Sequence, residues 1–200
     1  NIYMWISGVC SILLFNLYQP FMRIWMGDNL LFPTFTVLLM CIYFYSLKLG
    51  DIRSIYSNAS GLFWESKNYV IIEVILNGIL NYILGKMFGV NGIIIATNIT
   101  IIFINFLFGS RILFKHYFKN KKYYHFIFKN FLFGLITFIN GYISYNICNI
   151  INDKFSLNNF YQFIFNFIIC IIISNIIYLI IFYKTKEFKE GIMFIKKIIK

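Results

Sequence analysis

The chain has 200 residues, of which 60% are hydrophobic and 12% are charged, and its formal net charge is +11. A soluble globular domain is typically about 45–50% apolar and about 25% charged, so the composition excludes an ordinary soluble protein. We expect an all-α integral membrane protein, built as a polytopic bundle of transmembrane helices.

Six apolar stretches approach the roughly 20 residues that a membrane-spanning helix requires. They comprise residues 2–18, 32–61, 69–84, 92–113, 126–147 and 160–183. The third stretch is short and could extend toward Phe88. The first residues are already apolar and no charged segment precedes them, so we expect the chain to begin within a helix rather than with a signal peptide.

Short connections are expected between these stretches, at residues 19–31 with Pro20, 63–68, 86–91 with Gly89, 111–125 and 149–159. The segment 59–67, Ala-Ser-Gly-Leu-Phe-Trp-Glu-Ser-Lys, is interpreted as a cytoplasmic turn. Its small residues permit close helix packing, and Phe63 and Trp64 suit the membrane–water boundary.

The 18 Lys and Arg residues predict the orientation. If the basic connection 111–125 is cytoplasmic, alternation places fifteen of them on that side and leaves Arg23, Lys86 and Lys154 on the other. This asymmetry follows the positive-inside rule. We therefore expect a multi-pass protein of the cytoplasmic membrane with its C-terminus in the cytoplasm. The net charge is then a topology signal, with membrane lipids and not nucleic acid as partners, and the basic connection can attract anionic headgroups.

Residues 184–200 are expected to form a basic cytoplasmic tail. Phe188, Ile192, Ile195 and Ile199 recur at helical spacing, and lysines occupy the other face. The pattern is typical of an amphipathic helix on the inner leaflet, and a frayed tail is the alternative.

Polar side chains inside membrane spans are costly and often functional. The second stretch contains Lys48, Asp51 and Arg53, and the spacing of Lys48 and Asp51 allows them to pair. Two interpretations stay open. The charged third of this helix protrudes into the cytosol, or the helix breaks near Gly50 and its charges face an internal cavity.

The third stretch carries Glu73, Asn77 and Asn81 at intervals of four, which places them on one helical face. This stripe should face protein or a water-filled cavity rather than lipid. Hydrogen bonding between helices is one interpretation, and a cavity-lining or proton-coupling role for Glu73 is the other.

Other polar positions are interpreted as packing. Asn98 and Asn105 belong to this group, as does a stripe of small or polar residues at helical spacing, which consists of Asn130, Gly134, Thr137, Gly141 and Ser144. The four cysteines, Cys10, Cys41, Cys148 and Cys170, lie apart in the sequence inside apolar stretches and are interpreted as small buried hydrophobic residues.

The sequence lacks recognisable catalytic and metal-binding motifs. His116 and His125 lie in the basic connection without a carboxylate or serine at suggestive spacing. We therefore expect neither an enzyme nor a bound metal or cofactor.

Three segments in order resemble the C-terminal part of Wzx-type polysaccharide flippases, members of the multidrug/oligosaccharidyl-lipid/polysaccharide exporter superfamily. Residues 18–29, YQPFMRIWMGDN, resemble the family's turn after a helix. Residues 58–100 resemble its Gly-Leu-Phe loop, its glutamate-bearing helix and its Phe-Gly turn. A basic loop and a final helical hairpin follow. Ser57 and Asn58 stand where family members often carry a basic–acidic pair.

The resemblance implies a fragment of a two-bundle exporter fold that moves a polyprenyl-diphosphate-linked oligosaccharide during bacterial cell-surface polysaccharide biosynthesis. Further partners would be the polysaccharide polymerase or glycosyltransferases of the same pathway. Candidate cavity residues are Arg53 and Lys48 for the diphosphate, Glu73 for coupling or gating, and Asp51, Asn77 and Asn81.

Three alternatives remain open. A multidrug-type exporter of the same superfamily would share the fold. A membrane polysaccharide polymerase or acyltransferase would need reactive groups in the outer connections, which are short and contain no histidine. A membrane scaffold without transport activity is the third.

Overall fold

The computed structural model describes residues 2–119, 122–155, 158–185, 188–191 and 193. The chain is 91% helical, and no strand occurs in this described part. Six of its helices are long and apolar enough to cross a membrane. The expected all-α polytopic bundle is confirmed, and the chain is a multi-pass membrane protein.

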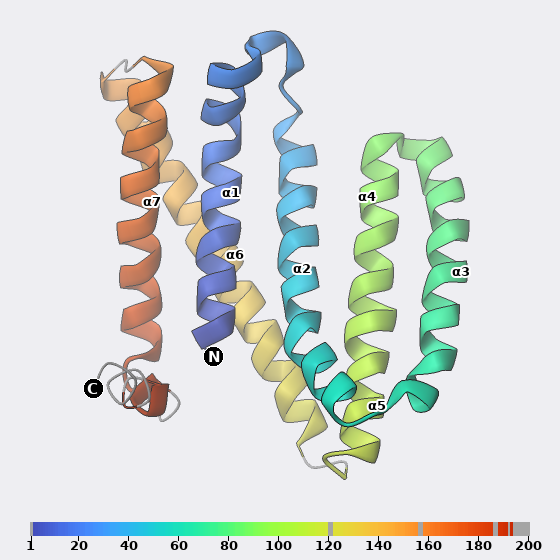
Figure 1. Cartoon of the computed structure of the whole chain (residues 1–200). Coiled ribbons are helices and arrows are strands. Elements are labelled where there is room, and N and C mark those ends of the chain that lie inside the picture. The colour runs from blue at the N-terminus through green and yellow to red at the C-terminus, as the bar shows by residue number, and fades with distance from the viewer. Residues whose placement is uncertain (1, 120–121, 156–157, 186–187, 192, 194–200) are drawn as a thin grey trace. The chain divides into compact units, whose positions relative to one another are not determined.

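The spans follow one another with very short connections (Figure 1). In chain order they are α1 (Ile2–Met26), α2 (Thr34–Ala59), α3 (Phe63–Phe88), a fourth span built from α4 (Val90–Ile99), η2 (Thr100–Phe108) and α5 (Gly109–His116), then α6 (Tyr123–Phe155) and α7 (Asn159–Phe182). A short 3-10 helix, η1 (Asp28–Leu30), lies between α1 and α2.

Most helices are longer than the apolar stretches that predicted them. The connection predicted from residue 19 was wrong, because α1 continues through Pro20 to Met26. Proline lacks the N–H that would bond to the carbonyl of Asn16, but this loss falls near the end of the helix. Likewise α6 continues to Phe155, past the predicted boundary at residue 149.

The connections at residues 63–68 and 111–125 were also predicted too long. Phe63 already begins α3, and the turn before it is confined to Ser60–Leu62, where Gly61 has φ 67°. The basic connection is helical up to His116 and again from Tyr123. In contrast, Gly89, with φ 59°, separates α3 from α4 as the sequence predicted. A positive φ is a conformation that glycine adopts at little cost.

The chain divides into two compact units. Unit 1 comprises Asn1–Phe32 and Phe133–Lys200, and unit 2 comprises Pro33–Leu132. Each unit has its own packing, and α6 contributes residues to both.

Unit 1 is held together by a seam of buried polar and small side chains. The Thr137 and Tyr178 hydroxyls lie 2.7 Å apart, and Asn140 donates to the carbonyl of Ser174. The Tyr178 hydroxyl also lies against Gly8 on α1. A Cβ at Gly8 would collide with this hydroxyl, so only glycine fits there. The predicted packing stripe on α6 therefore contributes two buried members, Thr137 and Ser144, to the unit 1 seam.

The cysteines of unit 1 include a pair that their distance in the sequence did not suggest. The Sγ atoms of Cys148 on α6 and Cys170 on α7 lie 3.5 Å apart, and both residues are buried free thiols. Their burial agrees with the interpretation as small hydrophobic residues, but they are not apart in space.

The described part of the tail contacts α1 within unit 1. The rings of Phe188 and Trp5 are stacked with centroids 5.7 Å apart. Ile192, Ile195 and Ile199 of the predicted amphipathic pattern lie outside the described residues.

In unit 2, α4 lies between α2 and α3 (Figure 1). The hairpin of α3 and α4 is tight because Gly92 lies against the backbone carbonyl of Leu84, where a Cβ would collide. α3 buries one residue of its own, Tyr69, within the described structure, while its other face exposes many large apolar side chains. This packing brings the polar residues of α2, α3 and η2 together.

Candidate functional site

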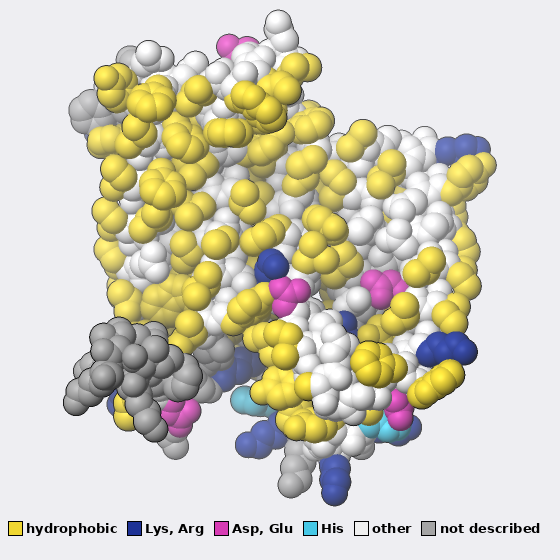
Figure 2. Space-filling view, viewed as in Figure 1, with side chains coloured by type: hydrophobic (Ala, Val, Ile, Leu, Met, Phe, Trp, Pro, Cys, Tyr) yellow, Lys and Arg dark blue, Asp and Glu magenta, His cyan; other side chains and the backbone are white. Residues whose placement is uncertain are grey.

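A cavity of about 410 Å³ is lined by residues of α2, α3, α4 and η2 in unit 2. Its volume falls within the range of about 300–1,000 Å³ that is usual for ligand pockets. The polar residues that line it are Asp51, Ser54, Glu73, Asn77, Thr97, Thr100 and Asn105. Hydrophobic side chains are spread over the surface of unit 2, and charged side chains gather at its lower end in the view of Figure 2.

Arg53 lies beside this cavity as a buried cation. Its side chain is 5% exposed, and its Nη1 donates to the hydroxyl of Tyr69 on α3 over 2.7 Å. Its Nη2 donates to Oδ1 of Asn105 over 2.7 Å. The guanidinium also lies over the Tyr69 ring, with Cζ 5.6 Å from the centroid. Arg53 therefore joins three helical segments of unit 2.

Asn105 connects this cation to an anion. Its Oδ1 accepts from Arg53, while its Nδ2 donates to both carboxylate oxygens of Glu73, over 3.2 and 3.0 Å. The two contacts fix which end of the amide faces which group. A membrane-embedded charge is costly unless it is paired, and the Asn105 amide links the two charges without direct contact between them.

Tyr69 and Glu73 are one helical turn apart on α3, so both ends of this arrangement return to the same helix face. We call the four residues Tyr69, Arg53, Asn105 and Glu73 the polar clasp. It closes from α3 through α2 and η2 back to α3. Removal of one member would break at least one hydrogen bond of its neighbours in the clasp.

The rest of the predicted stripe on α3 extends the polar face. Asn77 donates to the Thr100 hydroxyl over 2.8 Å, and Asn81 donates to Oδ1 of Asn77 over 2.6 Å. Asn77 lines the cavity with Glu73, whereas Asn81 does not. The stripe thus faces protein and cavity, and combines both interpretations that the sequence left open.

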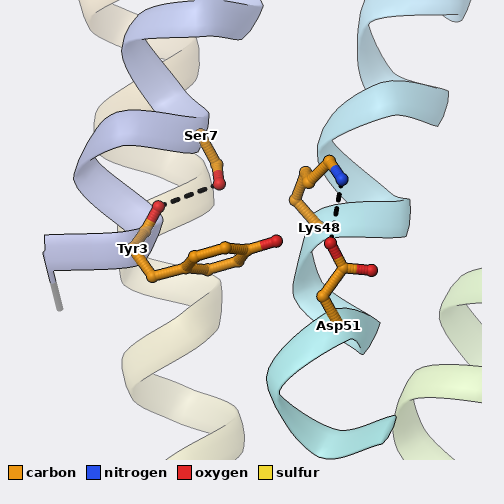
Figure 3. A network of polar contacts seen from close by, with 4 residues as sticks. All are labelled: Tyr3, Ser7, Lys48 and Asp51. Atoms are coloured by element: carbon orange, nitrogen blue, oxygen red, sulfur yellow. Dashed lines mark hydrogen bonds and ion pairs between the residues drawn. The ribbon is translucent and has the colours of Figure 1, made fainter. Parts of the chain in front are cut away.

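Lys48 and Asp51 form an ion pair along one turn of α2, with Nζ 2.9 Å from Oδ2 (Figure 3). Asp51 lines the cavity and Lys48 does not. Their side chains keep 34% and 41% of their surface exposed, so the pair contributes little to stability. Figure 3 also shows a contact within α1, in which the Ser7 hydroxyl donates to the carbonyl of Tyr3.

The second stretch does not break at Gly50, since α2 is helical from Thr34 to Ala59. Its ribbon bends in the last third (Figure 1). Gly50 and Asp51 nevertheless line the cavity, so part of the charged segment of α2 faces the cavity without a helix break. A Cβ at Gly50 would lie 3.2 Å from Oδ1 of Asn105, so glycine also permits the close approach of η2.

Sequence reasoning missed the central role of Asn105, which was interpreted as packing together with Asn98. Asn98 is buried and donates to the carbonyl of Leu39 over 3.2 Å, as a packing residue would. Asn105 differs because it lies in η2, where the helix is of the π type. Thr100 and Asn105 would lie about 140° apart around an α-helix, whereas bonds from i to i+5 bring such positions onto one side. An α-helical period therefore cannot find this pair.

The clasp is suited to holding polar groups in a membrane and offers no evident catalytic arrangement. Among the described residues, no group of three or more His, Cys, Asp or Glu side chains is close enough to hold a metal ion. The cavity combines carboxylates, amides and hydroxyls, which accept and donate hydrogen bonds. Such a lining suits a hydroxyl-rich or cationic ligand better than an anionic one.

Comparison of the chain with protein-family models, with curated proteins and with solved structures finds no match. The site is therefore interpreted from its own geometry and chemistry.

Proposed function

We propose that the chain is part of a membrane transporter that moves a polyprenyl-diphosphate-linked oligosaccharide across the cytoplasmic membrane. The observation that carries the proposal is the polar cavity of unit 2, which lies among membrane-spanning helices and is lined by Asp51, Glu73 and Asn77. Intramembrane carboxylates and amides mark the paths of substrates and ions. The lipid-linked substrate class is supported by the resemblance of residues 18–29 and 58–100 to Wzx-type flippases.

Under this proposal the cavity receives sugar hydroxyls, which carboxylates and amides bind well. Glu73 is the coupling or gating residue, because protonation of its carboxylate would change its contact with Asn105 and, through it, with Arg53. Lys48 and Arg53 attract the diphosphate in a conformation in which their present partners release them. Asn81 supports Asn77 from the next turn.

The test replaces Glu73→Gln and Arg53→Gln separately in the complete protein of the native host. We expect surface polysaccharide to fall at least tenfold in each variant, at unchanged membrane abundance of the protein. Lys86→Gln is the matched control, because Lys86 is exposed and bonds to the exposed Tyr82 hydroxyl. Normal polysaccharide in both site variants would exclude the proposed role of the cavity.

A second candidate is an exporter of cationic amphiphiles of the multidrug type. It is favoured by one observation: the charged residues that line the cavity, Asp51 and Glu73, are both acidic. Efflux of a fluorescent lipophilic cation from cells that express the complete protein distinguishes the two candidates. Efflux that Glu73→Gln abolishes, together with normal surface polysaccharide, would support the multidrug-type exporter and exclude the flippase.

A further inference from the structure

The α5 end of unit 2 carries a group of cations that the cavity does not use. We call Arg111, Lys115, Lys119 and Lys122 the basic tip; all four are exposed. His116 and His125 lie beside them in the sequence and are exposed as well. Figure 2 shows dark blue and cyan side chains gathered at the end where α5 lies in Figure 1. We propose that the basic tip is a docking surface for the headgroups of anionic membrane phospholipids.

The charge of the basic tip is not neutralised within the described structure. The sequence contains no acidic residue between Glu73 and Asp153. The ion pairs in the described part of the chain join Arg23 to Asp28 and Lys48 to Asp51, and neither involves the tip. Among the described residues, no ion pair joins these cations to an acidic side chain, so they are available to an external anion.

Aromatic rings pack together next to the basic tip and form an ordered base for it. The ring of Phe114 lies within 5.8 Å of the rings of Phe118, Tyr123 and Phe126, measured between centroids. Tyr123 also donates from its hydroxyl to the carbonyl of Leu107 over 3.2 Å. α5 contributes Leu113 and Phe114 to this buried side and keeps its cations exposed. Cations on an ordered base lose less conformational freedom on binding than cations on a free loop.

The position of the basic tip selects a lipid surface as its partner. The tip lies where one span ends at His116 and the next begins at Tyr123, and we expect the ends of spans at the depth of the lipid headgroups. Tyr117 and Tyr124 expose 51% and 84% of their surface there, as aromatic residues of a membrane interface do. Basic residues next to a span attract anionic lipid over distances comparable with the Debye length.

Native mass spectrometry of the full chain, released from detergent micelles, tests the proposal with added phosphatidylglycerol or phosphatidylcholine. The quadruple variant R111Q/K115Q/K119Q/K122Q is compared with R23Q/K67Q/K86Q/K154Q, which loses the same charge from positions outside both the basic tip and the basic tail. The variant K115R/K119R/K122R keeps the positive charge of the basic tip, so it tests whether charge alone supports the lipid preference. Helix content measured by circular dichroism confirms that each variant is folded.

We expect the native chain to retain phosphatidylglycerol over phosphatidylcholine. The tip variant should lose this preference by about tenfold or more, while the control quadruple and the arginine variant keep it. Equal retention by the tip variant and the native chain would overturn the proposal, as would an equal loss in the control quadruple. Displacement of the lipid by a single-stranded RNA at equal charge concentration would assign the tip to nucleic acid instead.

Discussion

The guanidinium of Arg53 lies against Gly109, in the space that a side chain at this position would occupy. A Cβ built on Gly109 would lie 2.7 Å from Nη1 of Arg53 and 2.9 Å from its Cζ. The missing side chain on α5 is what lets the cation reach both Tyr69 and Asn105. The polar clasp therefore depends on a residue that forms none of its hydrogen bonds.

Gly109→Ala should displace the guanidinium from its partners. We expect a loss of about 1–3 kcal/mol in the free energy of unfolding, as for other insertions of a methyl group into a packed site. Gly78→Ala is the control, because nothing lies within 4 Å of a Cβ at that helical position. Alanine there should be neutral or stabilising by up to about 1 kcal/mol. Thermal unfolding in detergent micelles compares the two, and equal stability of both variants would contradict the close contact.

Tyr69→Phe removes one acceptor from the buried guanidinium and keeps the ring. We expect the free energy of unfolding to fall by about 1–3 kcal/mol, because the Nη1 donor then lacks its partner. The control is Tyr82→Phe, whose hydroxyl bonds to the exposed Lys86 and whose side chain is 65% exposed. That change should stay within about 0.5 kcal/mol. A Tyr69 variant as stable as the Tyr82 variant would show that the clasp contributes nothing.

Gly92→Ala should open the α3–α4 hairpin, because the new Cβ would collide with the backbone carbonyl of Leu84. Backbone cannot move aside as a flexible side chain can, so we expect at least about 3 kcal/mol of destabilisation. Gly141→Ala places its Cβ 3.6 Å from the Ile12 side chain, an ordinary contact, and is the matched control. Unfolding midpoints in the same detergent measure both changes.

Cys148 and Cys170 should form a disulfide on mild oxidation with copper phenanthroline. Their Sγ atoms need to approach from 3.5 Å to about 2.05 Å. Alkylation under denaturing conditions should then count two free thiols instead of four. Cys148→Ala is the control, and its remaining three thiols should persist. Four alkylated thiols in the oxidised native chain would refute the proximity of α6 and α7 at this point.

The orientation in the membrane remains a prediction from the charge distribution. In a chain freed of its native cysteines, Asn158→Cys should react with an impermeant maleimide added to intact cells. Lys122→Cys should react only after the membrane is permeabilised. The reverse pattern would invert the topology and place the C-terminus outside.

Hydropathy was sufficient to find all six spans, because each must bury about 20 apolar residues in a bilayer. Their ends could not be found in the same way. The sequence predicted connections that include Pro20, Asp153 and the Phe63–Asn68 segment. All of these residues lie within helices. Beyond the apolar core, water satisfies the polar side chains while the backbone keeps its helical bonds, so polarity marks the membrane boundary and not the helix boundary.

The candidate site was only partly predictable for a different reason. The period of four on α3 placed Glu73, Asn77 and Asn81 on one face, and the structure finds them there. The partners that define their chemistry come from other helices. Tyr69 and Asn105 became significant only through contacts of 2.7 Å to Arg53, which no local pattern encodes.

The π-helical turns of η2 also make a prediction about evolution. A π segment accommodates more residues per turn than the α-helix around it, so loss of one residue between Thr100 and Phe108 could restore an ordinary helix and leave the span intact. Such a deletion would turn the side chain at position 105 away from Arg53 and Glu73. Related proteins that carry this deletion should therefore also lack the arginine at position 53 and the glutamate at position 73. An alignment of related sequences would show the deletion and the two substitutions together.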